Sequence, residues 1–355
     1  MIQPMSSQSR SKSMADFLTQ HGWKYEDAIP LANDASFRHY FRLKNGAHGA
    51  VLMDAPPPRE KILPFVSIAR HLKTLGYSAP DILAKDAING FLLLEDFGDQ
   101  TFARVLSESG AEDFIERERH LYSLAIDLLA DLHAKPTSQT VPNYLPLYNT
   151  ERLVNEVLLL TDWFIPSLTG KQVSPAARKD YVARWEAVTN QLDRSAVTLV
   201  LRDFHIDNLM YLHENFGLQR CGLLDFQDAL CGHPAYDLMS LLEDARRDIA
   251  PELQADMLKR YMTAMPDLSH PGPAQDKFLN AFFILAAQRH AKVIGIFTRL
   301  SKRDGKNSYM VHLPRVWELL ESSLGHPLLE PVESWININV AKELRIQIKT
   351  RAWSA

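Results

Sequence analysis

The stretch LVLRDFHIDNLMYL (residues 199–212), followed by CGLLDFQDAL (221–230) and GHPAYDL (232–238), decides the fold expected for this chain. Asp203 and Asn208 lie five positions apart in one segment, and Asp225 follows an apolar run. Three short apolar runs next to these residues predict strands at 197–201, 209–212 and 221–224. Two acidic residues and an amide on strand-flanked loops, with this spacing, are typical of the phosphoryl-transfer site of kinases.

The chemistry explains why these residue types are needed. Phosphoryl transfer requires a protein mainly to position the acceptor hydroxyl and to neutralise charge on the transferred group. Asp203 is therefore predicted to orient the acceptor and take its proton. Asn208 and Asp225 are predicted as oxygen ligands of a Mg²⁺ ion that bridges the nucleotide phosphates. Taken singly, each residue also fits a plain turn or the end of a strand, and His205 in the same loop is predicted to brace that loop.

At these residues the chain resembles the aminoglycoside phosphotransferase and choline kinase superfamily. Its segment LRDFHIDN (201–208) corresponds to the H-x-D-x-x-x-x-N of that superfamily, with Leu201 in place of the frequent His. The segment GHPAYDL (232–238) resembles the G-x-P-x-x-D-L of the superfamily. This second resemblance implies that Asp237 braces the catalytic loop.

The sequence is most similar to the anomeric sugar kinases that phosphorylate N-acetylmuramate and N-acetylglucosamine in bacterial cell-wall recycling. The similar segments are DASFRHYFR (34–42), VLMDAPP (51–57), DFQDA (225–229), YDLMSLL (236–242), QR (288–289) and IGIF (294–297). The resemblance implies transfer of the γ-phosphate of ATP, with Mg²⁺, to the anomeric hydroxyl of one of these amino sugars. An aminoglycoside, choline or other small-alcohol kinase and a nucleotide-binding pseudokinase are the alternatives.

Composition agrees with an enzyme of this size. The chain has 355 residues, 46% of them hydrophobic and 23% charged, which is enough for a large core and two lobes. A formal net charge of −4 gives no general attraction to nucleic acid or to an anionic membrane. Cys221 and Cys231 provide no disulfide framework, and buried thiols are favoured over a zinc site that would include His233. We expect a cytoplasmic enzyme without an obligate protein partner.

The expected fold is α+β, a two-lobed protein-kinase-like fold with a small N-terminal β-sheet lobe and a larger, mainly helical C-terminal lobe. The predicted divisions are a flexible tail at 1–14, a nucleotide-binding lobe at 15–97 and a catalytic and substrate lobe at 98–355. The first lobe is predicted from a hairpin at 37–53, a helix at 61–75 and a strand at 90–95. Helical periodicity predicts the second lobe from helices at 114–133, 153–164, 176–192, 236–246 and 278–300.

The nucleotide is expected between the loop 32–36 and the segment LEDFG (94–98). The loop lacks the G-x-G-x-x-G pattern and offers small residues and backbone donors instead. The segment LEDFG occupies the place of the kinase hinge, which offers backbone groups to adenine. Nucleotide-binding residues are therefore predicted at Ser36, Arg38, Arg42, Glu95 and Phe97.

Methionine at position 53 stands where kinases have the strand lysine that grips the nucleotide phosphates. Arg38 or Arg42, which share one face of their strand, is predicted to supply the missing positive charge. The alternative is that both arginines face water.

The sequence offers fewer indications of how the acceptor is recognised. An acetylated sugar needs polar partners, and a lactyl carboxylate favours an arginine fork. The candidates for substrate contact are Asp228, Arg246, Gln288 and Arg289. Charges on solvent-exposed helix surfaces would explain the arginines equally well.

Overall fold

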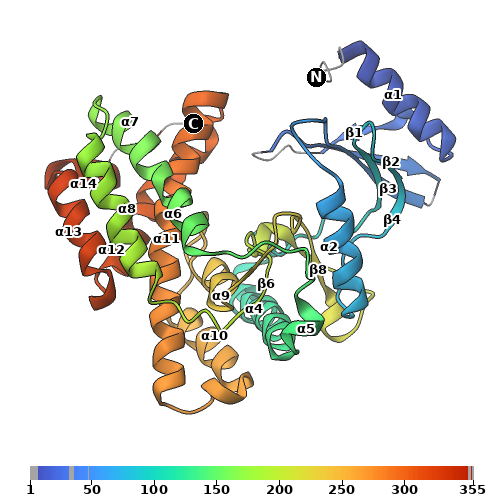
Figure 1. Cartoon of the computed structure of the whole chain (residues 1–355). Coiled ribbons are helices and arrows are strands. Elements are labelled where there is room, and N and C mark those ends of the chain that lie inside the picture. The colour runs from blue at the N-terminus through green and yellow to red at the C-terminus, as the bar shows by residue number, and fades with distance from the viewer. Residues whose placement is uncertain (1–6, 32–35, 47, 351–352, 354–355) are drawn as a thin grey trace. The chain divides into compact units, whose positions relative to one another are not determined.

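A five-stranded antiparallel sheet forms within the first hundred residues (Figure 1). The computed structural model describes residues 7–31, 36–46, 48–350 and 353. The spatial order of the strands is β1-β2-β3-β5-β4. Their bounds are β1 Ile29–Pro30, β2 His39–Asn45, β3 His48–Asp54, β4 Ile82–Asp86 and β5 Phe91–Glu95. The predicted hairpin and the predicted strand at 90–95 are confirmed by β2, β3 and β5.

The chain divides into two compact units. The first unit comprises Met1–Leu124 and Ile206–Ala229, and the second comprises Ala125–His205 and Leu230–Ala355. One division falls within a helix, α4 (Ala111–Ala134), and another falls between His205 and Ile206. The lobe boundaries expected from the sequence stay a prediction.

One face of the sheet is covered by the first helix, α1 (Ser7–Gln20), which lies beside the strands in Figure 1. Met14, Phe17 and Leu18 are buried against sheet residues such as Leu52. The prediction of a flexible tail is wrong for residues 7–14, because this polar stretch continues directly into the apolar helix face that the sheet binds. Residues 1–6 lie outside the described part of the chain.

The remaining elements of the first unit include a second hairpin. Helix α2 (Leu63–Thr74) confirms the predicted helix and buries Phe65, Val66, Ile68, Ala69 and Leu72. The hairpin consists of β7 (Leu209–Tyr211) and β8 (Cys221–Leu223), where strands were predicted. Ser78 forms a parallel bridge with Gly222, so the segment after α2 runs along β8. Helix α3 (Phe102–Ser107) and three short 3₁₀ turns, Tyr25–Asp27, Ile206–Asn208 and Gly217–Arg220, complete the unit.

Helices make up most of the second unit. They are α5 Thr137–Thr140, α6 Thr150–Leu159, α7 Ile165–Thr169, α8 Pro175–Thr189, α9 Ala235–Leu242, α10 Pro251–Ala264, α11 Pro273–Asp304, α12 Leu313–Leu324, α13 Glu330–Asn339 and α14 Lys342–Thr350. The long α11 runs through the middle of this group in Figure 1, and its inner face is buried with Trp185, Trp317 and Trp335. A π-helical turn at Leu160–Phe164 extends α6, so the helix predicted at 153–164 changes its winding near its end.

Two short strands of the second unit hold the start of the catalytic segment. β6 (Thr198–Val200) pairs with β9 (Leu230–Gly232) in antiparallel register. Asp203 follows β6 by three residues, and α9 follows β9 by three residues. The pairing therefore brings the predicted catalytic loop next to the start of α9.

Within the described residues, no helix has both the length and the apolar composition needed to cross a bilayer. The two cysteines, Cys221 and Cys231, are buried free thiols. Burial raises the pKa of both thiols above its ordinary value.

Candidate active site

The predicted catalytic loop begins at a strained residue in the second unit. Arg202 has a φ of 72°, in the left-handed region that side chains other than glycine adopt at a cost. Asp237, at the start of α9, accepts hydrogen bonds from the backbone N–H groups of Leu201 at 2.6 Å and Arg202 at 2.9 Å. These two bonds hold the bend that presents Asp203.

Asp237 itself is fully buried. Burial raises the pKa of its carboxyl to about 7, against the opposing effect of the two backbone hydrogen bonds. The sequence resemblance implies a bracing role for this residue, and its two hydrogen bonds to the loop have the geometry that such a role needs.

Asp203 is partly exposed in this loop and carries an ionised carboxyl. Its side chain is 38% exposed, and its Oδ1 lies 3.6 Å from Nη1 of Arg289 on α11. Burial alone would raise the pKa of Asp203, but the positive charges of Arg289, Lys292 and Arg202 outweigh it and lower the pKa to about 2. The carboxylate is therefore ionised over the whole physiological pH range.

A buried network of charged and polar groups lies behind Asp203. Glu156 on α6 accepts from Arg202 at 2.5 Å, pairs with Lys292 at 3.3 Å and also accepts from the hydroxyl of Tyr148. Gln288 is fully buried and donates to Glu156 and to the carbonyl of Leu153, at 3.1 Å each. Its amide thus supports the network, which argues against the predicted contact of Gln288 with a substrate.

The first unit holds the two predicted metal ligands close together. Nδ2 of Asn208 lies 3.5 Å from Oδ2 of Asp225, and the backbone N–H of Leu224 donates to the carbonyl of Asn208 at 3.0 Å. Gln227 donates to Oδ1 of Asp225 at 2.5 Å. Asp225 has a φ of 55°, a second left-handed residue, so its carboxylate is turned out of the line of β8.

These groups fit a Mg²⁺ ion. A carboxylate and a carboxamide are hard oxygen donors, and rotation of the Asn208 amide by half a turn exchanges its nitrogen for its oxygen, which then lies beside the Asp225 carboxylate. Phe226, next to Asp225, packs against Phe65 of α2 with ring centroids 4.9 Å apart. The position of Asp225 is thereby tied to α2.

The side chain at the place of the kinase strand lysine is Met53, which is fully buried in β3. Met53 pairs with Tyr40 of β2, and alternate residues along a strand share a face. Arg38, two residues before Tyr40, is 7% exposed and pairs with Glu60 at 2.8 Å. The interpretation that Arg38 simply faces water does not hold.

Arg42 does not face water either. It lies 2.7 Å from Asp96 and 2.6 Å from Asp99, and it donates to the carbonyl of Gly98 at 2.8 Å. Its guanidinium therefore connects β2 to the predicted hinge.

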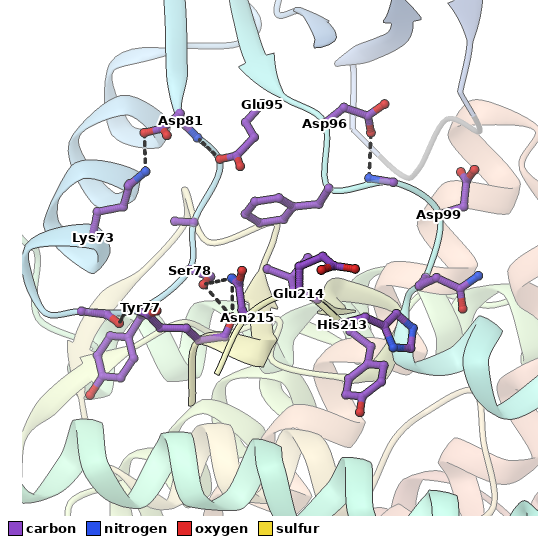
Figure 2. Close-up of a pocket in the computed structure, with 18 residues that line it drawn as sticks. Lys73, Tyr77, Ser78, Asp81, Glu95, Asp96, Asp99, His213, Glu214 and Asn215 are labelled. Carbon is purple, nitrogen blue, oxygen red and sulfur yellow. Dashed lines mark hydrogen bonds and ion pairs between the residues drawn. The ribbon is translucent and has the colours of Figure 1, made fainter. Parts of the chain in front are cut away.

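A cavity of about 540 Å³ lies beside the predicted hinge in the first unit (Figure 2). This volume is within the range of small-molecule pockets, about 300–1,000 Å³. The lining includes the predicted nucleotide residues Glu95 and Phe97, together with the segment 76–81 and the turn between β7 and β8. Glu95 accepts from the backbone N–H of Asp81 at 3.0 Å, as Figure 2 shows.

Charge argues against the nucleotide phosphates in this cavity. Five carboxylates line the cavity, those of Asp81, Glu95, Asp96, Asp99 and Glu214. The lysine among the lining residues, Lys73, is paired with Asp81. Neither Asn208 nor Asp225 is among the lining residues. A triphosphate would be repelled here, so this cavity does not suit the nucleotide phosphates.

Arg246, a predicted substrate residue, lies next to His205. Its Nη1 is 3.2 Å from Nε2 of the histidine. Burial and the nearby Arg246 lower the pKa of His205.

Two more predicted site residues lie in the first unit. Asp228 is exposed on the turn after Asp225. The hydroxyl of Ser36 accepts from the backbone N–H of Arg38 at 3.2 Å. Residues 32–35 of the predicted phosphate loop lie outside the described residues.

Several residues of the site were missed from the sequence. Glu156 and Lys292 had a detectable signal, because each is a charged residue on the apolar face of a helix and such residues are rarely buried unpaired. Glu60 and Tyr148 gave no detectable signal in the sequence, because each lies in or next to an irregular segment without periodicity.

The fold and the loops described above define a protein-kinase-like phosphotransferase. The model of the family described as "Phosphotransferase enzyme family" matches residues 27–273. The chain belongs to this family, and it is a kinase.

The chain is 33% identical over 371 residues to an N-acetylmuramate/N-acetylglucosamine kinase of Caulobacter vibrioides, covering 96% of this chain and 99% of the relative. It is 37% identical over 303 residues to the protein of the same name from Pseudomonas aeruginosa, covering 84% of each. A choline/ethanolamine kinase family protein from Mesorhizobium loti superposes with a TM-score of 0.58 at 12% identity, covering 94% of this chain and 100% of that one. This last likeness shows the fold.

Proposed function

We propose that this kinase transfers the γ-phosphate of ATP to the anomeric hydroxyl of N-acetylmuramate or N-acetylglucosamine. The observation that supports it most directly is the pair Asn208 and Asp225, 3.5 Å apart, with Asp203 five residues before Asn208 in one loop. The substrate rests on the names of the relatives from Caulobacter vibrioides and Pseudomonas aeruginosa.

Each group has a distinct role. Asp203 orients the anomeric hydroxyl and accepts its proton as the oxygen attacks the γ-phosphorus. An anomeric hydroxyl is more acidic than an ordinary alcohol, so a weakly basic carboxylate is adequate for this transfer. Asn208 and Asp225 hold Mg²⁺, which when bound neutralises charge on the nucleotide phosphates.

Two further assignments follow for the nucleotide. Arg38 supplies the cation that Met53 lacks, since it lies directly before β2, two residues from the Tyr40 that pairs with Met53, and it pairs with Glu60. Arg42 orders the hinge through Asp96, Asp99 and Gly98. The hinge segment at Glu95 and Phe97 offers backbone groups to adenine, and the enzyme works in the cytoplasm.

The acceptor is tested by measuring ADP release with N-acetylmuramate, N-acetylglucosamine, an aminoglycoside and choline. We expect release with one or both amino sugars, loss of it on chelation of Mg²⁺, and a fall of roughly 10²- to 10⁴-fold in Asp203→Asn. Arg178→Ala is a matched control because Arg178 forms only a half-exposed surface ion pair with Asp162. Release with choline or the aminoglycoside but neither sugar would contradict the proposal.

A further inference from the structure

We infer that Arg289 is a positioning residue for Asp203: its guanidinium holds the carboxylate in place from below the catalytic loop and does not contact the sugar. This inference rests on the proposed function for the role of Asp203. It replaces the sequence-based assignment of Arg289 to substrate binding.

The contacts of Arg289 point to the loop. Its Nη1 donates to the carbonyl of Arg202 at 3.2 Å and to the hydroxyl of Tyr236 at 3.4 Å, and lies 3.6 Å from Oδ1 of Asp203. The side chain is 9% exposed, whereas that of Asp203 is 38% exposed. Arg289 thus lies under the loop, and Asp203 is the group that a substrate can reach.

The rest of the network fixes Arg289 itself. The guanidinium carbon lies 5.7 Å from the ring centroid of Tyr236, whose hydroxyl also accepts from Lys292 at 3.3 Å. Lys292 pairs in turn with Glu156. Glu156 pairs with both Lys292 and Arg202. Arg289 is therefore the cation of this network whose ion pair is with Asp203.

This arrangement has a consequence for the reaction. Oδ1 of Asp203 lies 3.6 Å from Nη1 of Arg289, so the guanidinium fixes the direction in which the carboxylate meets the acceptor hydroxyl. A carboxylate that rotates would meet that hydroxyl in the right direction only part of the time, and small misplacements of a reacting group are costly.

The charged and titratable groups that surround Asp203 come from three elements. They are Arg202 and His205 on its own loop, Arg289 and Lys292 on α11, and Asp237 on α9. Among the groups that lower the pKa of Asp203, the charge of Arg289 has the largest effect. Removal of this charge alone should therefore be measurable at the carboxyl.

The experiment compares Arg289→Met, Arg289→Lys and the control Arg260→Met, whose arginine forms a surface ion pair with Asp127 in the same unit. Two quantities are measured: kcat and KM for the amino sugar, and the pKa of Asp203 from a ¹³C-carboxyl NMR titration assigned with Asp203→Asn. In Arg289→Met we expect kcat to fall roughly 10- to 100-fold with KM nearly unchanged. The pKa of Asp203 should rise by about one unit or more.

Arg289→Lys keeps the charge and loses the planar fork, so we expect a pKa near that of the wild type and an intermediate kcat. If Arg289→Met does not fold, the lysine variant still separates charge from geometry. An unchanged pKa in Arg289→Met, or a raised KM for the sugar with kcat unchanged, would overturn the inference. A wild-type enzyme that phosphorylates neither sugar would instead end the proposed function, and the NMR titration would still decide the role of Arg289.

Discussion

At the scale of single residues, the site depends on groups that leave regular backbone geometry. Arg202 and Asp225 both have positive φ values, and each stands next to or at a predicted functional group. Such conformations cost free energy and persist only where surrounding bonds enforce them. For Arg202 these bonds come from Asp237.

The replacement of the strand lysine yields a prediction at this scale. Arg38→Met should raise KM for ATP by roughly 10- to 100-fold, because a charge-assisted hydrogen bond to phosphate is worth about 1.5–3 kcal/mol. Arg42→Met should raise the KM for ATP less, since Arg42 is already paired with Asp96 and Asp99. Steady-state kinetics with saturating sugar measure both.

Arg38→Lys serves as the control that keeps the charge. The assignment fails if Arg38→Met and wild type have equal affinity for ATP, or if Arg42→Met has the larger effect.

At the scale of elements, the packing of α11 against α6 decides where the network lies. α6 carries Glu156, and α11 carries Gln288, Arg289 and Lys292. The two helices approach closely at Gly295, where an added Cβ would lie 2.3 Å from the backbone carbon of Leu159 and 2.6 Å from its oxygen. A backbone obstacle of this kind cannot rotate away, so only glycine fits.

Gly295→Ala should therefore destabilise the protein by about 3 kcal/mol or more, at the upper end of overpacking effects. The measurement is a thermal or urea unfolding curve beside that of the wild type. Gly325→Ala is the matched control, because its Cβ would meet a nearest atom at an ordinary 3.4 Å. Equal stability of Gly295→Ala and wild type would show that the helices can separate without cost.

At the scale of the whole molecule, buried ionisable groups make stability depend on pH. Burial lowers the pKa of His133 to about 3, and that of His233 to about 4. Nδ1 of His133 is hydrogen-bonded to the hydroxyl of Tyr261 at 2.7 Å. The folded state therefore binds fewer protons than the unfolded state between these values and about pH 6.5, and stability falls as the pH falls through this range.

Asp237 acts in the opposite sense. Because its pKa is raised to about 7, the folded state keeps a proton that the unfolded state loses above about pH 4. The histidines outweigh this single carboxyl, so the net expectation is acid destabilisation.

The contribution of His133 can be isolated with His133→Gln, which keeps a polar partner for Tyr261. Between pH 7 and pH 5 the wild type should lose about 2 kcal/mol more stability than this variant. Urea unfolding at the two pH values measures the difference. Parallel losses in both proteins would mean that His133 does not titrate on unfolding.

Some elements of the chain are specified by local sequence signals, and others by packing between distant segments. The hairpin β2–β3, helix α2 and the long α11 follow from alternation, turn residues and helical periodicity, which are local properties. Helix α1 was missed because its first turns are polar, and it is held by packing against the sheet. The π-helical turn after α6 has no local signal, since the winding depends on what packs against it.

The sequence by itself determined the residue types predicted for the reaction and their order: an acid, then an amide five positions on, then a second acid after a strand. Spacing along the chain suffices for this because each of these residues lies within a few positions of a short apolar strand, which is a local signal. Only the tertiary structure decided that Arg38 pairs with Glu60, that Gln288 is buried, and that Arg289 lies under Asp203. Those partners are far apart in the chain, and burial and charge pairing between distant segments leave no periodic trace in sequence.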